Sequence, residues 1–244
     1  MTAMIAAFQF LTIFPTFIKR MFTSRELGQA VGWFPLVGVA LGTLLYAVNH
    51  AARLVFPNSV SAALTLLAWV VFTRAFHLDG FMDTCDGLFG GWTPERRLEI
   101  MKDSRMGAFG AAGGVLVLLL KYTALAASLD IGPVLVISTT LARWGMALAI
   151  FAFPYAREHG LGRDLKDNVG WLQIVLATCI ALIVIWFATG MMGLIAFALA
   201  GLALWLGARF ILRLIPGLTG DSYGALCEGI ELAVLLFFTA RGVL

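Results

Sequence analysis

Charged side chains are scarce in this sequence. Aspartate, glutamate, lysine and arginine together make up 13% of its 244 residues, whereas a typical soluble domain contains about 25%. The formal net charge is only +3, and no basic cluster lies on a polar stretch, so we expect no nucleic-acid partner. No long polar stretch separates the apolar segments either. We therefore expect one integral-membrane domain over residues 1–244.

Cysteine is scarce as well. The three cysteines are an odd number, and no two of them form a C-x-x-C pair. A disulfide framework needs an even set, and a zinc site of the common type needs closely spaced pairs. Neither kind of site is therefore expected around Cys85, Cys179 and Cys227.

Apolar residues are abundant: 61% of the chain is hydrophobic and the mean hydropathy is +0.93. Runs of about 20 apolar residues, long enough to cross a bilayer, recur along the sequence. We expect an all-α, polytopic helical bundle in a lipid bilayer with seven or eight membrane segments, because the first and third are short and "ATGMMG" is a tight turn. The expected segments are 1–18, 29–48, 60–76, 107–128, 133–153, 171–189, 191–211 and 223–243.

Basic residues predict the orientation of these segments. Short loops rich in lysine and arginine face the cytoplasm. With eight spans, the basic connections all fall on one side, so we expect that side to be cytoplasmic and both termini to face outward. The residues concerned are Lys19, Arg20, Arg25, Arg74, Arg96, Arg97, Lys102, Arg105, Arg157, Arg163, Lys166, Arg209 and Arg213.

The motif "HLDGFMDTCDG" places three carboxylates at the end of an apolar run. Asp79, Asp83 and Asp86 share one face if a helix continues through them, because an α-helix has 3.6 residues per turn. Adjacent carboxylates repel one another unless a cation lies between them, and oxygen-only ligands favour Mg²⁺. The alternative is an ordinary acidic helix end in contact with water.

A second polar motif, "PERRLEIMKDSRMG", follows at once. Pro94 suits the first position of a helix, and Glu99 and Asp103 would then share a face. Lys102 and Arg105 could hold phosphate oxygens, which suggests metal-assisted phosphoryl transfer with Glu99 as a further ligand. The alternative is a surface helix with intrahelical ion pairs.

The last apolar segment carries "TGDSYGALCEGIEL". Asp221 is a good helix N-cap, whereas Glu228 and Glu231 lie inside an apolar helix, where acidic side chains are costly and often functional. Arg143, in the middle of the fifth segment, could pair with them in a purely structural role. The side chain of Lys121 could instead extend to the membrane surface.

Two further sites are weaker. "PYAREHGLGRD" contains Arg157, His159 and a flexible "GLG", which could form a substrate loop. His77 precedes the aspartates and could be a base or an interfacial side chain.

Four motifs in this order, "FHLDGFMDTCDG", "EIMKDSRMGAFG", "YAREHGLG" and "TGDSYGALCEGIEL", resemble the cobalamin synthase family, the adenosylcobinamide-GDP ribazoletransferases. The early "FLTIFP" and "GWFPLVGVALG" extend the resemblance over nearly the whole chain. It implies that α-ribazole or α-ribazole 5′-phosphate is joined to adenosylcobinamide-GDP with release of GMP. It also implies Mg²⁺ as cofactor and the bacterial inner membrane as location, with the active site facing the cytoplasm.

Within the reaction that the resemblance implies, we assign roles to the residues above as our own hypotheses; the family supplies the motifs but not this division of roles. Mg²⁺ would be held by Asp79, Asp83 and Asp86, with Glu99 nearby, and would act on the pyrophosphate. Asp103 would be the general base, with Asp83 and Asp86 as further catalytic carboxylates. The expected substrate-binding residues are His77, Lys102, Arg105, Arg143, Arg157, Asp221, Glu228 and Glu231.

Two other functions fit parts of the sequence. A CDP-alcohol phosphotransferase also carries a "D-x-x-D-G" pair, which "DTCDG" resembles, but the "AR" expected after it is missing. A cation-coupled transporter would use intramembrane charges, but it usually has internal repeats, and we find none. The order of the motifs favours the cobalamin synthase family. Whether the chain forms a homo-oligomer is left open.

Overall fold

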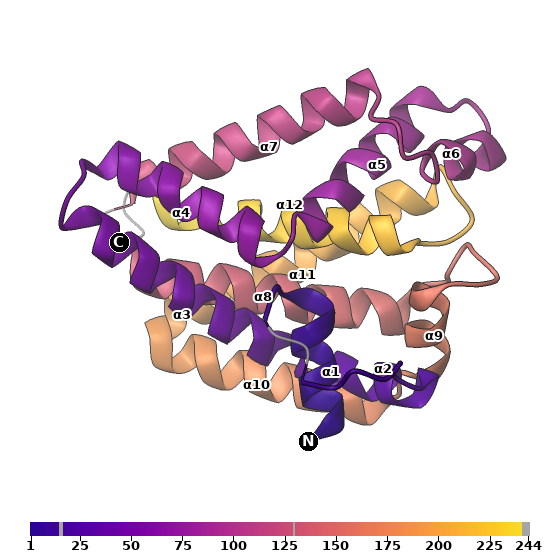
Figure 1. The fold of residues 1–244 in the computed structure, drawn as a ribbon, viewed down its shortest axis with the longest axis horizontal. Coiled ribbons are helices and arrows are strands. Elements are labelled where there is room, and N and C mark those ends of the chain that lie inside the picture. Colours follow the sequence, from indigo (N-terminus) through magenta and orange to yellow (C-terminus); the bar gives the residue numbers. More distant parts are fainter. Residues whose placement is uncertain (15–16, 129, 241–244) are drawn as a thin grey trace.

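The computed structural model describes residues 1–14, 17–128 and 130–240. The described residues form helices joined by short connections, which confirms the predicted all-α fold (Figure 1). In chain order these are α1 (Thr2–Leu11), α2 (Ser24–Ala30), the 3₁₀ helix η1 (Val31–Trp33), α3 (Phe34–Arg53), α4 (Asn58–Phe72), α5 (Phe76–Gly90), α6 (Pro94–Ile100), α7 (Ala108–Ala127), α8 (Ile131–Ala152), α9 (Leu161–Asn168), α10 (Trp171–Thr189), α11 (Met191–Leu212) and α12 (Gly220–Thr239).

Six helical stretches of the described residues are long and apolar enough to cross a membrane, and the bent pair α4–α5 would make a seventh. The predicted first segment is wrong as a span, because α1 has only 10 residues. Counting the pair α4–α5 as one crossing gives an odd number. The segment containing α1 and the end of α12 then lie on opposite sides of the membrane, not on the same side as eight spans would require.

The break between α4 and α5 turns the chain by 86°. Arg74 and Ala75 both have φ of 55°, in the left-handed region that residues with a β-carbon seldom adopt. This turn contains no proline or glycine from which the break could have been predicted. The predicted segment 60–76 therefore ends earlier than expected, and α5 starts in a new direction.

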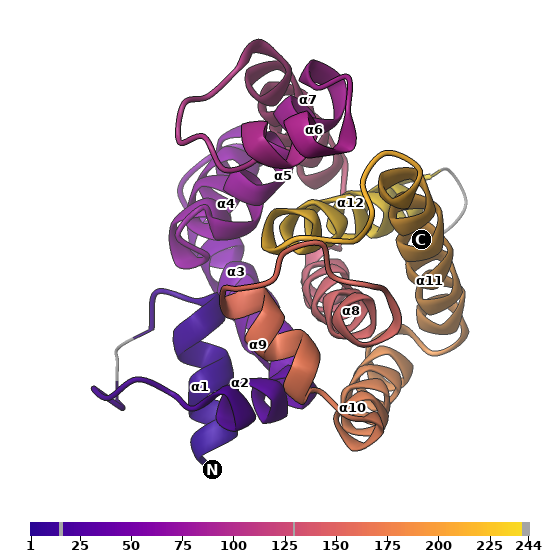
Figure 2. The same ribbon diagram turned by 90° about the vertical axis from the view of Figure 1, so that its right-hand side faces the viewer.

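Helix α8 is the centre of the bundle. Figure 2 shows it surrounded by α3, α10, α11 and α12, and 83% of its most apolar window is buried. Helix α3 approaches closely at Gly38, where the Thr139 hydroxyl donates a 2.7 Å hydrogen bond to the Gly38 carbonyl. Small residues allow such close packing between membrane helices.

Helices α10 and α11, unlike α8, are mostly exposed on the outside of the bundle. Only 17% and 28% of their apolar windows are buried, so most of their hydrophobic side chains point outward, as in a helix that faces lipid. The tight turn predicted at "ATGMMG" is confirmed, and the two helices form a hairpin. Gly190, with φ of 57°, joins them.

The polar connections gather at one end of the bundle. Helices α6 and α9 and the start of α12 lie together at the right of Figure 1, while the connection between α3 and α4 lies at the far left. The acidic motif on α5 faces this polar end, so the fold brings together the motifs that lie far apart in the sequence.

Candidate active site

The first aspartates lie on α5 as predicted. The helix runs from Phe76 to Gly90, so Asp79 and Asp83 are one turn apart. Asp79 is exposed and Asp83 is partly buried. Both carboxylates therefore remain accessible from the polar end of the bundle.

The first turn of α12 lies directly against these aspartates. A β-carbon at Gly80 would lie 2.9 Å from the carbonyl oxygen and 3.0 Å from the Cα of Asp221. Only glycine allows the two backbones to approach so closely. Gly80 thereby places Asp221 beside Asp79 and Asp83, close enough for their charges to interact.

Asp221 is oriented by two neighbours. Its Oδ2 accepts a 2.6 Å hydrogen bond from Nη2 of Arg157, with about a fifth of each side chain exposed, and a 3.3 Å bond from Oγ1 of Thr219. The predicted N-cap was wrong: the Thr219 side chain caps the helix by accepting from the Ser222 amide. Asp221 sits in the first turn, with its carboxylate turned to the arginine.

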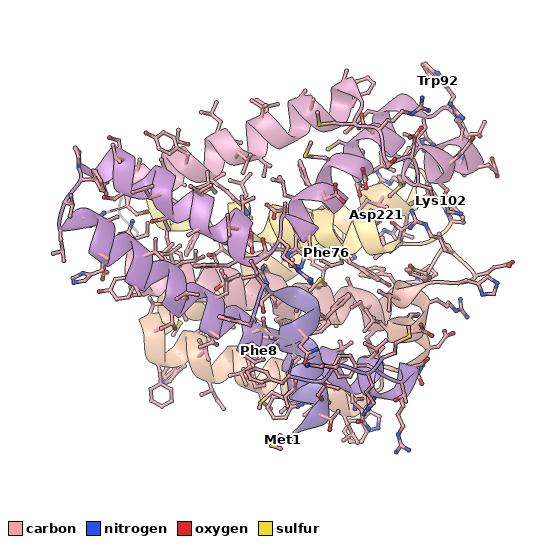
Figure 3. All side chains as sticks on the ribbon, viewed as in Figure 1. Met1, Phe8, Phe76, Trp92, Lys102 and Asp221 are labelled. Carbon is pink, nitrogen blue, oxygen red and sulfur yellow. The ribbon has the colours of Figure 1, made fainter. Side chains whose placement is uncertain are left out.

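Two adjoining clefts open around this ion pair. The smaller, about 220 Å³, is lined by Asp79, Tyr155, Arg157 and Asp221 among others. The larger, about 510 Å³, lies between α6 and the connection after α8 and includes Lys102, Arg157 and His159. Figure 3 places Lys102 and Asp221 at the same end of the molecule. The clefts share Arg157 and His159, so the structure brings the predicted substrate loop to the aspartates.

Asp86 has a different environment. It is 7% exposed, and its two carboxylate oxygens accept backbone hydrogen bonds from Gly107 (2.7 Å) and Gly110 (2.8 Å) at the start of α7. A carboxylate in this position satisfies free amides and interacts favourably with the helix dipole. The geometry thus explains Asp86 as a helix cap, and its predicted role in metal binding stays a prediction.

The second polar motif contributes Lys102 to the larger cleft, but its acidic residues Glu99 and Asp103 line neither cleft. Helix α6 starts at Pro94 as predicted but ends at Ile100, so Asp103 is not on this helix. Glu99 pairs with Arg96 at 2.7 Å on the exposed surface. The shared helical face predicted for Glu99 and Asp103 is therefore wrong.

Asp103 forms its own surface pair with Arg105, at 2.6 Å. Hydrogen bonds from the Arg105 side chain and amide lower the pKa of Asp103 to about 2. A carboxylate with so low a pKa is a weak proton acceptor at neutral pH. This geometry does not favour the predicted general-base role, and it occupies the Arg105 side chain that was expected to hold phosphate.

Glu228 and Glu231 lie in a buried charge network. Lys121 pairs with both glutamates, and Glu231 also pairs with Arg143. These four side chains are at most 8% exposed, so the Lys121 side chain does not extend to the membrane surface. The structural pairing of Arg143 with Glu231 is confirmed. The groups contact one another in the bundle interior, and this arrangement offers no open surface for the substrate contacts predicted for them.

His77 adjoins this network. It is 1% exposed, and its Nδ1 lies 3.3 Å from Nη2 of Arg143. The histidine is therefore an interior residue on α5 and not an interfacial side chain.

The carboxylates near the clefts are suitable ligands for a metal ion, but they do not form a complete coordination site. No three histidine, cysteine, aspartate or glutamate side chains of the described residues form a group that could hold a metal ion. Mg²⁺ is usually held by one or two carboxylates together with substrate phosphates, and it keeps several waters. The two carboxylates of Asp79 and Asp83, one turn apart on α5, suit such an open site because their donors are oxygen.

Sequence reasoning missed Tyr155, which lines a cleft, and Tyr223, which packs against it. Tyr155 lines the smaller cleft, and its ring stacks on Tyr223 at a centroid distance of 5.9 Å. Both tyrosines lie within the polar motifs, next to Arg157 and Asp221. Their proximity in sequence to charged motif residues was the only indication that they lie near the site.

The comparisons with known proteins agree with these motifs. The sequence profile of the family described as cobalamin-5-phosphate synthase matches residues 3–239. A protein of Desulforamulus reducens named adenosylcobinamide-GDP ribazoletransferase is 41% identical over 233 residues, which cover 94% of this chain and 92% of that protein. A protein of Pseudomonas aeruginosa with the same name is 41% identical over 249 residues, covering 96% of each chain. No solved structure matches the chain.

The profile match runs from α1 to the end of α12 and includes all four polar motifs. Relatives at this level of identity, aligned over nearly their full length, share the family and not only the membrane topology. The resemblance carried by the motifs is thus confirmed, and the chain belongs to the cobalamin-5-phosphate synthase family.

Proposed function

We propose that the protein joins α-ribazole or its 5′-phosphate to adenosylcobinamide-GDP and releases GMP. A ribose hydroxyl of the acceptor attacks the phosphorus attached to the cobinamide arm. The new oxygen–phosphorus bond forms as the bond to GMP breaks, and the hydroxyl proton is taken up by a carboxylate. The names of the close relatives support this reaction.

The observation that carries the proposal is the meeting of Asp79, Asp221 and Arg157 at one cleft. Phosphoryl transfer needs positioned charge more than covalent chemistry. The Arg157 guanidinium suits phosphate oxygens, and Lys102 in the adjoining cleft adds a second cation. We assign the pyrophosphate of adenosylcobinamide-GDP to the space between them.

Mg²⁺ is proposed as the cofactor. Asp79 and Asp83 would hold it, one turn apart on α5, together with phosphate oxygens of the substrate. The ion would supply stabilisation of negative charge on the transferring phosphoryl group. Asp221 lines the same cleft, and Arg157 and Thr219 orient its carboxylate. We assign uptake of the hydroxyl proton to Asp221.

The proposed location is the bacterial inner membrane, with the polar end of the bundle in the cytoplasm. The connections at this end carry most of the lysines and arginines, including Lys102, Arg105, Arg157, Arg163 and Lys166. Positive charge in short loops is retained on the cytoplasmic side. A polar, bulky corrinoid would then meet the clefts from water.

The test is GMP release by the purified protein in liposomes supplied with adenosylcobinamide-GDP and α-ribazole. We expect release that requires α-ribazole, stops with EDTA and returns with added Mg²⁺. Asp83→Asn should lower it by about 10²- to 10³-fold, whereas Asp167→Asn, which changes an exposed aspartate of α9, should leave it unchanged. Turnover of CDP-diacylglycerol with an alcohol instead would overturn the proposal. The same assay with α-ribazole 5′-phosphate decides which acceptor is preferred.

A further inference from the structure

An apolar crevice lies between α5, α11 and α12, and α12 is the middle one of the three helices (Figure 2). Its volume is about 340 Å³, which is within the range of small-molecule sites. Of the described residues that line it, only Thr84 and Cys85 have a polar side-chain atom. The crevice shares no lining residue with the two clefts, so it is a separate feature of the molecule.

The crevice opens on the outside of the bundle. Its lining residues Phe89 and Phe210 are 55% and 44% exposed, and Gly229, within the membrane-spanning helix α12, is exposed as well. Because most of α11 faces lipid, the medium at this opening is hydrocarbon. An empty space would leave the wall without van der Waals partners, and water would find too few polar groups there. Hydrocarbon is therefore the expected occupant.

The position and length of the crevice fit one acyl chain. On α11 the crevice extends from Ala203 to Ile211, next to the end of the helix at Leu212, which lies at the polar end of the bundle. This stretch of helix rises about 12 Å. One leaflet of a bilayer contributes about 15 Å of hydrocarbon. The crevice thus matches a chain of a lipid in the leaflet at the polar end.

Two arginines lie where the headgroup of such a lipid would be. Arg213 follows the last residue of α11 and is exposed, and it forms no ion pair with another residue in the described part of the chain. The Arg97 side chain reaches the same place, because its Nη1 donates a 3.0 Å hydrogen bond to the Leu214 carbonyl. Guanidinium groups suit phosphate oxygens. The charge at this end of the crevice therefore favours an anionic headgroup.

We infer that the crevice binds one acyl chain of an anionic phospholipid, whose headgroup lies against Arg97 and Arg213. This lipid site is distinct from the clefts and does not depend on the proposed reaction. Each arginine near the headgroup should favour an anionic over a zwitterionic lipid by about fivefold.

The test is photo-crosslinking in liposomes that contain equal parts of phosphatidylglycerol and phosphatidylcholine. One of the two lipids carries a diazirine in the middle of its acyl chain, and the labelled residues are mapped by mass spectrometry. We expect phosphatidylglycerol to label residues 203–211 and 225–230 at least about fivefold more than phosphatidylcholine does. Labelling of the lipid-facing helix α10 should not differ between the two lipids and serves as the internal control.

Two substitutions test the two parts of the site. Gly229→Leu places a side chain in open space within the crevice and should remove most of the labelling of its wall. Ala112→Leu, on an exposed position of α7, is the matched control and should change nothing. Arg213→Gln should lower the preference for phosphatidylglycerol about fivefold. Arg163→Gln on α9 should leave it unchanged.

Wild-type labelling without a preference for phosphatidylglycerol would overturn the inference, and so would wall labelling that folded Gly229→Leu retains in full. The first result would mean that lipids cover this face without a headgroup site, and the second that the chain lies outside the crevice. Protection of the wall from both lipids would show that protein covers it, which also contradicts the inference. Arg213→Gln keeps the test decisive if Gly229→Leu does not fold, because Arg213 lies on the exposed surface.

Discussion

The Asp221 carboxylate at the start of α12 lies 2.6 Å from the Arg157 guanidinium, although 64 residues separate them in the chain. The pair links the last helix to the connection after α8. It lies between the two clefts, because Arg157 lines both.

Arg157→Lys should weaken the binding of adenosylcobinamide-GDP. Lysine keeps the charge but loses the planar fork that can hold Asp221 and a phosphate together. We expect the KM for this substrate to rise about tenfold, and the unfolding temperature to stay nearly constant. Steady-state GMP release and thermal unfolding in detergent are the measurements. Arg163→Lys on α9 is the control, and an equal effect of both substitutions would contradict the assignment.

Asp83→Asn and Asp103→Asn test which of the two acidic motifs contributes to catalysis. Asp83 is proposed to hold Mg²⁺, and loss of such a carboxylate would remove several kcal/mol of transition-state stabilisation, so Asp83→Asn should lower kcat about 10²- to 10³-fold. Asp103 is paired with Arg105 on the surface, and its substitution should change kcat far less. The measurement is GMP release at saturating Mg²⁺. If Asp103→Asn lowered kcat more than Asp83→Asn does, Asp103 would again be the preferred general base.

Gly80→Ala adds only one methyl group, but we expect it to lower GMP release strongly. The added methyl group would lie 2.9 Å from the Asp221 carbonyl oxygen and push α12 away from α5. Overpacking of this kind costs about 1–3 kcal/mol of stability, and a misplaced catalytic group can cost about 10²-fold in rate. Gly229→Ala on α12 is the control, because a β-carbon there meets open space. Unchanged GMP release by folded Gly80→Ala would contradict this account of the close approach.

Lys121→Met should destabilise the bundle. It removes the cation that pairs with Glu228 and Glu231, and breaking a buried ion pair from one side costs about 3–5 kcal/mol. Thermal unfolding in detergent measures the loss. Arg163→Met breaks an exposed pair with Asp167, which is worth at most about 1 kcal/mol. Equal shifts in the two variants would show that the interior network adds no stability.

The long helices and the polar end could be predicted because apolar run length and loop charge are local properties. The partner of Glu231 could also be predicted, since few cations lie within the apolar segments. The break at Arg74 and Ala75 could not, because no proline or glycine marks it.

The end of α6 was missed for a related reason. The pattern of acids continues to Asp103, but Met101 is buried against Gly87 of α5 and the helix stops. The contacts of Asp86 were missed because they are made with backbone amides at the start of α7, 21 and 24 residues later in the chain. Tertiary packing decided each of these cases.

The buried network has an electrical consequence. Lys121 and Arg143 carry two positive charges and Glu228 and Glu231 two negative ones, so the formal sum is zero. A membrane voltage does work only on net charge that moves through it. In the proposed function, substrates enter and leave at one end of the bundle and would therefore cross none of the voltage drop. Turnover should therefore be electrically silent and indifferent to the energised state of the membrane.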